Sequence, residues 1–549
     1  MTRLFAVMIL AIALAVVICP QPRAHGAAPI GFENVAEQAG LRFVLENHPT
    51  PEKHNIETMA GGVAVFDYNN DGRPDIFFTN GAAVPELRKE SAKDYNRLFR
   101  NEGGLKFTDV TEQAGLTGQG YSSGAAAADY DNDGHVDLFV AGAYHNILYH
   151  NRGDGTFEDV TAKAGIRSDK WTVAAGWFDY DKDGLLDLFV VNYMKWTPSF
   201  NLYCGDPARQ FRIYCHPNDF GGLANNLYRN RGDGTFEDVS DRTGISRYIG
   251  RGMSVAFGDY DGDGFPDALV TNDQLPNFLF RNVQGQRFEE TGLMAGVALL
   301  DNGKPVSSMG VDFRDYDNDG RPDIVITALS GETFPLFHNQ GNGTFRDATY
   351  ASGVGSASAR HSGWCAALTD FNNDGYKDIF IAGGHVNDRI AEMEPSRYKE
   401  PNLVLLNLGN GKFRDVSASA GQEFAQTPRA HRGCGLADFD GDGLQDVVVT
   451  ALGDPPELWH NVTKITARWV DVDLRGTASN RDGIGATIRI GNQYQIRTSA
   501  AGYASSSLVP VHFGGIGAND QIEIRWPSGK LQRIPVSKVN GIQVVTEPK

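Results

Sequence analysis

Acidic side chains recur in this sequence in a nine-residue pattern, D-x-[DN]-x-D-G-x-x-D, which occurs seven times. The acids or amides stand at positions 1, 3, 5 and 9, and the glycine at position 6 permits the sharp turn that brings them around one centre. Ligand sets made only of oxygen suit a hard cation such as calcium, to which the main-chain carbonyl of position 7 can add another oxygen. We therefore predict up to seven calcium sites.

The predicted ligands follow the same order in every loop, with position 7 contributing only its carbonyl. Of the 28 side-chain ligand positions, 26 are Asp and two are Asn. The seven sets are Asp67, Asn69, Asp71, Arg73 and Asp75; Asp129, Asp131, Asp133, His135 and Asp137; Asp179, Asp181, Asp183, Leu185 and Asp187; Asp259, Asp261, Asp263, Phe265 and Asp267; Asp315, Asp317, Asp319, Arg321 and Asp323; Asp370, Asn372, Asp374, Tyr376 and Asp378; Asp438, Asp440, Asp442, Leu444 and Asp446.

Two other interpretations of these loops fit less well. An EF-hand requires Glu at position 12, where every loop here has an apolar residue such as Phe78 or Val140. Turns without metal would leave several carboxylates close together and repelling one another. Seven calcium ions would also change the formal charge from −18 to −18 + 14 = −4, which suits a protein in solution.

The elements around the loops indicate an all-β fold. Each loop lies between two short apolar stretches of strand length, and a second pattern follows it: an apolar strand ending in Asn, a Gly-rich turn, and a Phe. Four strands in a unit of ~50 residues are typical of a β-propeller. We predict a seven-bladed β-propeller over residues 30–461, closed by pairing of strand 32–35 with the strand that ends at 461. The recurring aromatic residues are Phe32, Phe107, Phe157, Phe236, Phe288, Phe345 and Phe413.

The seven loops resemble the calcium-binding FG-GAP and VCBS repeats of β-propellers, which also form the heads of integrin α-subunits. Residues 466–549, with "SNRDGIGATIRI", "GYASSS" and "IEIRWPSGKLQ", resemble the ASPIC/UnbV domain, a small β domain that follows such propellers in the cartilage acidic protein (CRTAC)-like family. The resemblance implies an exported calcium-binding protein in which the listed side chains and position-7 carbonyls hold the ions.

The amino-terminal segment resembles a secretory signal peptide. Arg3 precedes an apolar stretch over residues 4–18, and small residues follow it. We predict a signal peptide over residues 1–26 and a secreted or periplasmic protein with no membrane span after cleavage. An uncleaved anchor, or a lipoprotein attached through Cys19, remains an alternative. The 50 basic against 68 acidic residues argue against nucleic acid or an anionic membrane as partner.

Insertions at 81–97, 194–226 and 386–401 lengthen three of the units, and we expect them to form rim loops. Cys204 and Cys215 lie close together in the second insertion, and an oxidising compartment would link them in a disulfide. Cys365 and Cys434 lie within apolar strands, where we expect small buried thiols.

The sequence contains none of the common catalytic motifs that we sought, such as a nucleophile elbow, a Walker loop or a zinc-protease motif. Our leading hypothesis is an exported calcium-binding scaffold, not an enzyme, that binds a protein or glycan through its rim loops. The alternative is an enzyme with a metal-dependent site on the rim opposite the calcium loops. His361, His385 and His431 would hold that metal, because the strand lengths place all three at that rim.

Overall fold

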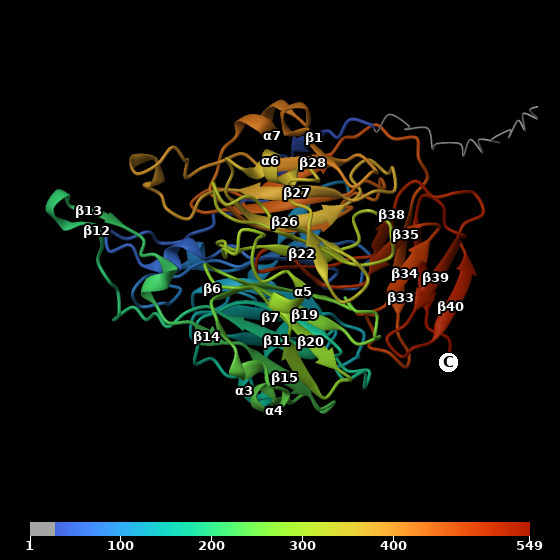
Figure 1. The fold of residues 1–549 in the computed structure, drawn as a ribbon. Helices are drawn as coiled ribbons and strands as arrows, with labels where there is room; N and C mark the ends of the chain where they lie inside the picture. Colours follow the sequence, from blue (N-terminus) through green and yellow to red (C-terminus); the bar gives the residue numbers. More distant parts are fainter. Residues whose placement is uncertain (1–27) are drawn as a thin grey trace, which may run out of the picture.

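The computed structural model describes residues 28–549. The predicted signal peptide and Cys19 lie outside the described residues. Strands dominate the described chain, and the helices in it have only four or five residues (Figure 1). These helices share one place, in the connection that follows the last short strand of a repeat unit: α1 (Ala36–Ala39), α2 (Thr111–Ala114), α3 (Thr161–Ala164), α4 (Ser240–Thr243), α5 (Gly292–Ala295), α6 (Val354–Ser358) and α7 (Gln422–Gln426).

Residues 32–461 contribute seven antiparallel sets of four strands, which we call sheets 1 to 7 in chain order. Sheets 1 to 4 follow the chain in simple up-and-down order. Sheet 1 contains β2 (Val63–Phe66), β3 (Asp75–Phe78), β4 (Arg97–Asn101) and β5 (Phe107–Asp109); sheet 2 contains β6 (Ser122–Ala128), β7 (Asp137–Gly142), β8 (Ile147–Asn151) and β9 (Phe157–Asp159); sheet 3 contains β10 (Thr172–Phe178), β11 (Asp187–Asn192), β15 (Asn226–Asn230) and β16 (Phe236–Asp238); sheet 4 contains β18 (Gly252–Gly258), β19 (Asp267–Asn272), β20 (Phe278–Val283) and β21 (Arg287–Glu290).

Sheet 7 joins the two ends of this region. Its outermost strand is β1, which pairs with β32 in the register Phe32↔Asn461, so the predicted pairing is confirmed. The remaining sheets are sheet 5, with β22 (Val311–Arg314), β23 (Asp323–Ile326), β24 (Leu336–Asn339) and β25 (Phe345–Asp347); sheet 6, with β26 (Gly363–Thr369), β27 (Asp378–Gly383), β28 (Leu403–Asn407) and β29 (Phe413–Asp415); and sheet 7, with β30 (His431–Ala437), β31 (Asp446–Ala451), β32 (Glu457–Asn461) and β1 (Phe32–Asn34).

The first strands of the seven sheets contact one another in cyclic order, β2 to β6, β10, β18, β22, β26, β30 and back to β2. They are the innermost strands, and all residues of β6, β10, β18, β26 and β30 are buried. Small residues allow seven strands to approach one axis, and β6 reads SSGAAAA. The sheets therefore follow one another in a ring.

The carboxyl-terminal residues form two further sheets around a separate apolar core. In Figure 1 these red strands lie at one side of the ring, while the hairpin of β12 (Cys204–Asp206) and β13 (Phe211–Ile213) projects at the opposite side. One sheet contains β38 (Val511–Phe513), β33 (Val470–Arg475) and β41 (Ile542–Thr546); the other contains β35 (Gln493–Ile496), β34 (Thr487–Ile490), β39 (Gln521–Arg525) and β40 (Leu531–Pro535).

Two short strands of this carboxyl-terminal region leave it and join the ring. β36 (Ala500–Ala501) and β37 (Ser505–Leu508) form a hairpin. β37 pairs in parallel with the innermost strand of sheet 1, in the register Ala64↔Ser506. Sheet 1 therefore has six strands, and the two regions of the chain share a sheet.

The described residues contain two disulfides. Cys204 is bonded to Cys215, which confirms the sequence prediction. Cys365 is bonded to Cys434, so the expectation of buried thiols was wrong. Their strands, β26 and β30, are neighbours at the centre of the ring, and the Cα atoms are 5.8 Å apart although 69 residues separate them in sequence.

Candidate calcium-binding face

Each acidic loop connects the first and second strands of a sheet, and all seven have the same main-chain hydrogen-bond frame. A carboxylate oxygen of position 1 accepts the N–H of the glycine at position 6, at 2.7–3.0 Å. The carboxylate of position 5 accepts the N–H of position 7, at 2.8–3.0 Å. These bonds turn the carboxylates of positions 1 and 5 toward the inside of each loop.

The Asp at position 9 is the first residue of the second strand and is fully buried in every sheet. One of its oxygens accepts the N–H of position 2, at 3.0–3.2 Å. The other accepts the N–H of the Asn that ends the third strand (in sheet 4 the last residue but one), at 2.7–2.9 Å. Position 9 therefore ties the loop to two strands of its own sheet.

Burial strongly disfavours the charged form of these carboxylates. It raises the pKa of Asp75 to about 8 and that of Asp137 to about 7. It also raises the pKa of Asp378 well above its ordinary value, with the nearby charge of Asp370 as a further cause. A divalent cation inside the loop would supply the missing positive charge. The donor set, oriented oxygens from positions 1, 3, 5 and 9 of one loop, therefore fits calcium.

Basic side chains from the third strand reach several of these loops, a feature that the sequence analysis missed. The residue before the strand-ending Asn is Arg229 in sheet 3, whose guanidinium contacts Asp181 at 2.6 Å and Asp183 at 2.7 Å. His150 in sheet 2 takes the equivalent place, with Nδ1 3.2 Å from Asp137. The signal was present in the sequence as the basic residue of LYHN, LYRN, LFRN, LFHN and LWHN. The other members are Arg281, His338 and His460.

The strand-ending Asn residues join each sheet to the loop of the preceding sheet. Asn151 Nδ2 donates to the carbonyl of Tyr68, at position 2 of loop 1, at 2.8 Å. Asn101 makes the same bond to Phe439 of loop 7 at 3.0 Å, across 338 residues of sequence. The bond recurs in the other five sheets from Asn230, Asn282, Asn339, Asn407 and Asn461.

The aromatic residue at position 2 and the recurrent Phe form a matching set of contacts. Phe107 of sheet 1 packs edge-on against Phe439 of loop 7, with ring centroids 5.7 Å apart. The sequence analysis found the recurrent Phe but missed the aromatic residue at position 2 of each loop. The other six pairs are Tyr68–Phe157, Tyr130–Phe236, Tyr180–Phe288, Tyr260–Phe345, Tyr316–Phe413 and Phe371–Phe32.

The carboxyl-terminal region covers part of this face. Asp482 accepts the N–H of Asp129 at 2.8 Å, and His512 Nε2 lies 2.7 Å from Asn373 Oδ1 of loop 6. Burial, and secondly the charge of Asp482, raise the pKa of Asp129 to about 8. A side chain at Gly443 of loop 7 would meet the Trp469 ring at 2.0 Å. The loops and the carboxyl-terminal region are therefore in close contact.

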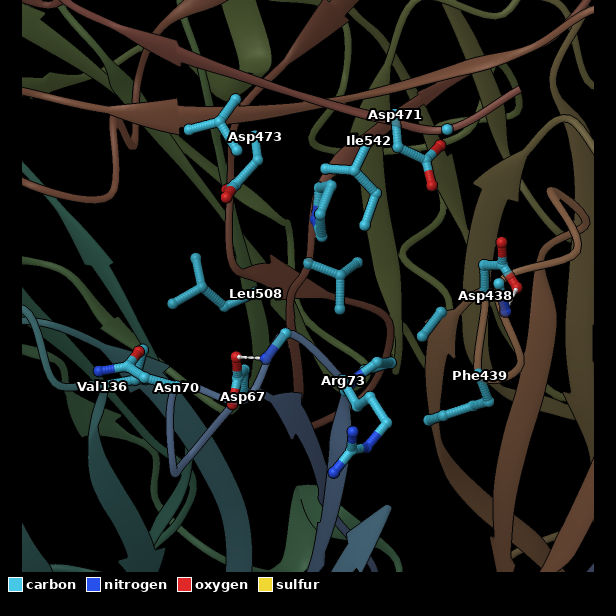
Figure 2. Close-up of a pocket in the computed structure, with 18 of the residues that line it drawn as sticks. Asp67, Asn70, Arg73, Val136, Asp438, Phe439, Asp471, Asp473, Leu508 and Ile542 are labelled. Carbon is cyan, nitrogen blue, oxygen red and sulfur yellow. Dashed lines mark hydrogen bonds between the residues drawn. The ribbon is translucent and has the colours of Figure 1, made fainter. Parts of the chain in front are cut away.

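A cleft of about 730 Å³ lies between the two regions. Figure 2 shows Asp67 and Asp438, from loops 1 and 7, on one side of it and Asp471 and Asp473 of β33 on the other. The exposed side chain of Ile542 also lines the cleft. Carboxylates of both regions thus face the same space.

The three rim histidines each have a contact within the protein. His361 Nδ1 lies 3.2 Å from Glu400, and His385 Nδ1 accepts the N–H of Asn387 at 3.0 Å. His431 is fully buried, with Nδ1 2.6 Å from the carbonyl of Gly383 and Nε2 3.0 Å from Glu457. A shared metal site at these residues remains a prediction.

In the part of the chain that the structure describes, no helix has the length and apolar character needed to cross a membrane.

The repeats and the carboxyl-terminal region both match known families. The model of the FG-GAP-like repeat matches residues 67–140, 129–190, 214–270, 261–326, 315–381 and 370–449, and the chain belongs to this family. The model described as ASPIC and UnbV matches residues 476–549. The resemblance to the CRTAC-like family is therefore confirmed.

Curated relatives include cartilage acidic protein 1 from Mus musculus, 25% identical over 363 residues, covering 56% of this chain and 54% of the relative. The Homo sapiens protein is 24% identical over 419 residues, covering 63% of this chain and 62% of the relative. The chain thus spans between half and two thirds of these relatives. Among solved structures, an Agrocybe aegerita lectin that recognises non-reducing terminal N-acetylglucosamine has a TM-score of 0.39, 17% identity, and coverage of 72% of this chain and 87% of its own.

Proposed function

We propose that this protein is an extracytoplasmic scaffold, a seven-bladed β-propeller that binds up to seven calcium ions and a macromolecular partner at its rim. The observation that carries the calcium proposal is the shared frame of the seven loops, in which buried and oriented carboxylates meet without enough positive charge. In this proposal calcium neutralises the carboxylates and links the first two strands of each sheet. Its function is structural, and no catalytic step is assigned to it.

The proposed partner surface lies on the side of the ring opposite the carboxyl-terminal region. There the disulfide-linked hairpin of the 194–226 insertion meets the 386–401 insertion, with the Arg389 guanidinium 3.8 Å from the centre of the Phe211 ring. Phe200 is 51% exposed and Tyr203 45% exposed in the same insertion, just before this hairpin. Large exposed apolar and aromatic side chains on a braced loop are typical of recognition surfaces. The partner we propose is an extracytoplasmic protein or glycan.

Removal of calcium tests the structural role. Each site loaded at a hundredfold excess over Kd adds about 2.7 kcal/mol to the stability of the native state, so excess EGTA should lower Tm strongly and added calcium should restore it. Asp263→Ala should remove one bound calcium ion from the stoichiometry, whereas Asp301→Ala, at an exposed position outside the loops, should remove none. An unchanged melting curve in EGTA, with calcium shown to be absent, would contradict the proposal.

The rim surface is tested by capture from the native envelope or medium. The double variant Phe200→Ser, Tyr203→Ser should lose a partner that the wild type retains. Leu293→Ser, Met294→Ser is the matched control, because these side chains are 68% and 83% exposed on α5. Equal loss in both variants, or in neither, would contradict recognition by the 194–226 insertion.

Metal analysis of protein purified without chelator or tag tests the alternative function. Stoichiometric copper, iron or zinc that is lost in His385→Ala, with calcium unchanged, would favour an enzyme. Calcium as the only metal would end that hypothesis.

A further inference from the structure

The centre of the ring is occupied by residues 499–508 of the carboxyl-terminal region, which we call the channel segment. It comprises the hairpin of β36 and β37, and nearly all of its residues are buried. Tyr503 at its tip is fully buried, and its hydroxyl donates to the carbonyl of Met59 at 3.0 Å. Main-chain N–H and C=O groups that are buried in this way need hydrogen-bond partners, both in the segment and in the strands around it.

Three consecutive serines accept hydrogen bonds from the surrounding strands. Ser505 Oγ accepts the N–H of Val63 in sheet 1 at 3.2 Å. Ser506 Oγ accepts the N–H of Ala127 in sheet 2 at 3.1 Å. Ser507 Oγ accepts a third N–H, from Leu436 in sheet 7, at 3.0 Å. Each hydroxyl thus serves the innermost strand of a different sheet.

The rest of the segment reaches the other four sheets. Gly502 exchanges two main-chain hydrogen bonds with Val311 of sheet 5, at 2.9 and 3.1 Å. Ala504 N donates to Ser254 Oγ of sheet 4 at 3.4 Å. Tyr503 packs edge-on against the Trp of sheet 6, Trp364, with centroids 4.7 Å apart. The segment also lies against β10 of sheet 3.

The contact between the ring and the channel segment is so close that it admits only small residues. A Cβ on Gly62 would lie 2.4 Å from the carbonyl oxygen of Ala504, and one on Gly502 would lie 2.1 Å from the Cys365 sulfur. Both sides of the contact therefore depend on glycine. The Cys365–Cys434 disulfide lies directly beneath the segment, where it joins two innermost strands.

We propose that the channel of the ring is a peptide-binding site whose resident ligand is residues 499–508 of the same chain. The ligand class is a short peptide of small residues with consecutive hydroxyls and one aromatic side chain. This site holds the carboxyl-terminal domain on the ring independently of the covalent linker at residues 462–469. It also closes the channel, so the channel is not a passage for substrates.

The test is to cut the linker in the full-length protein. A protease site is inserted between Thr466 and Ala467, in a stretch without secondary structure, and the cut protein is followed by size-exclusion chromatography with calcium present throughout. The carboxyl-terminal fragment should stay with the ring. Release of the wild-type fragment on cutting would overturn the proposal.

Side-chain variants distinguish the contribution of the channel contacts to retention from that of the contacts on the loop face. The triple variant Ser505→Ala, Ser506→Ala, Ser507→Ala should weaken retention about a hundredfold, from three hydrogen bonds of ordinary net strength. Ser537→Ala, at an exposed serine of the same domain, should change nothing. If only His512→Ala releases the fragment and the triple variant retains it, loop-face docking holds the domain and the proposal fails.

Hydrogen exchange on the intact wild type gives a reading that needs no variant. The amides of Val63, Ala127 and Leu436 should exchange as slowly as amides inside the sheets, because the serine hydroxyls cover them. Fast exchange at all three, with slow exchange in the neighbouring strands, would show that the segment leaves the channel readily and would overturn the proposal.

Discussion

Replacement of Asn101 by Ala should destabilise the whole ring, because this side chain joins sheet 1 to loop 7. Asn101 is fully buried. Its Nδ2 donates to Phe439 O at 3.0 Å and to Pro74 O at 3.1 Å, and its Oδ1 accepts the N–H of Gly103 at 2.9 Å. Three bonds at about 1 kcal/mol each, with buried carbonyls left unpaired, predict a loss of about 2–4 kcal/mol in the free energy of unfolding.

The assay is urea unfolding followed by tryptophan fluorescence at saturating calcium. Asn342→Ala is the control, since that exposed Asn bonds only within its own turn, to Thr344, and should cost less than about 1 kcal/mol. Asn151→Ala removes the equivalent bond to Tyr68 across only 83 residues of sequence. If Asn101→Ala costs no more than the control while Asn151→Ala costs several times more, contact between sheet 1 and loop 7 does not hold the ring closed.

Three further predictions concern other contacts. Replacing both Cys365 and Cys434 by Ala should cost about 4 kcal/mol, from the loss of a link across 69 residues; calorimetry checks this, and an unchanged Tm would refute it. Burial raises the pKa of Glu547, but hydrogen bonds from a serine hydroxyl and three consecutive main-chain N–H groups outweigh it and lower the pKa to about 2. The resulting stability is present above the ordinary value near 4.5 and is lost as pH falls toward 2, so Glu547→Gln should remove this acid dependence from pH-titrated unfolding; an unaltered profile would contradict it. Gly443→Ala should displace the Trp469 ring and change its fluorescence, because the added Cβ would lie 2.0 Å from it; an unchanged emission spectrum would refute that contact.

The local features of this protein could be predicted from its sequence because their determinants lie within a few residues of one another. The loop pattern places its acids and glycine within nine positions, and the alternation of loops and Asn-ended strands marks four strands per unit. The offset between Phe32 and Asn461 indicated the closing pair, since the first unit lacks a strand and the last lacks a Phe. Cys204 and Cys215 were assigned for the same reason, being close in sequence in a predicted oxidising compartment.

Apart from that closing pair, only the tertiary structure decided which distant residues meet. Closure of the ring brings Asn101 against Phe439 and places Cys365 beside Cys434, although no short-range pattern links either pair. The serines of the channel segment resemble any small polar stretch in the sequence. Ser505 and Ser506 bond strands more than 370 residues away, and Ser507 bonds a strand 71 residues away. Burial likewise raises the pKa of the position-9 carboxylates. Water is excluded from them by all the packed sheets together, and not by the nine residues of a loop.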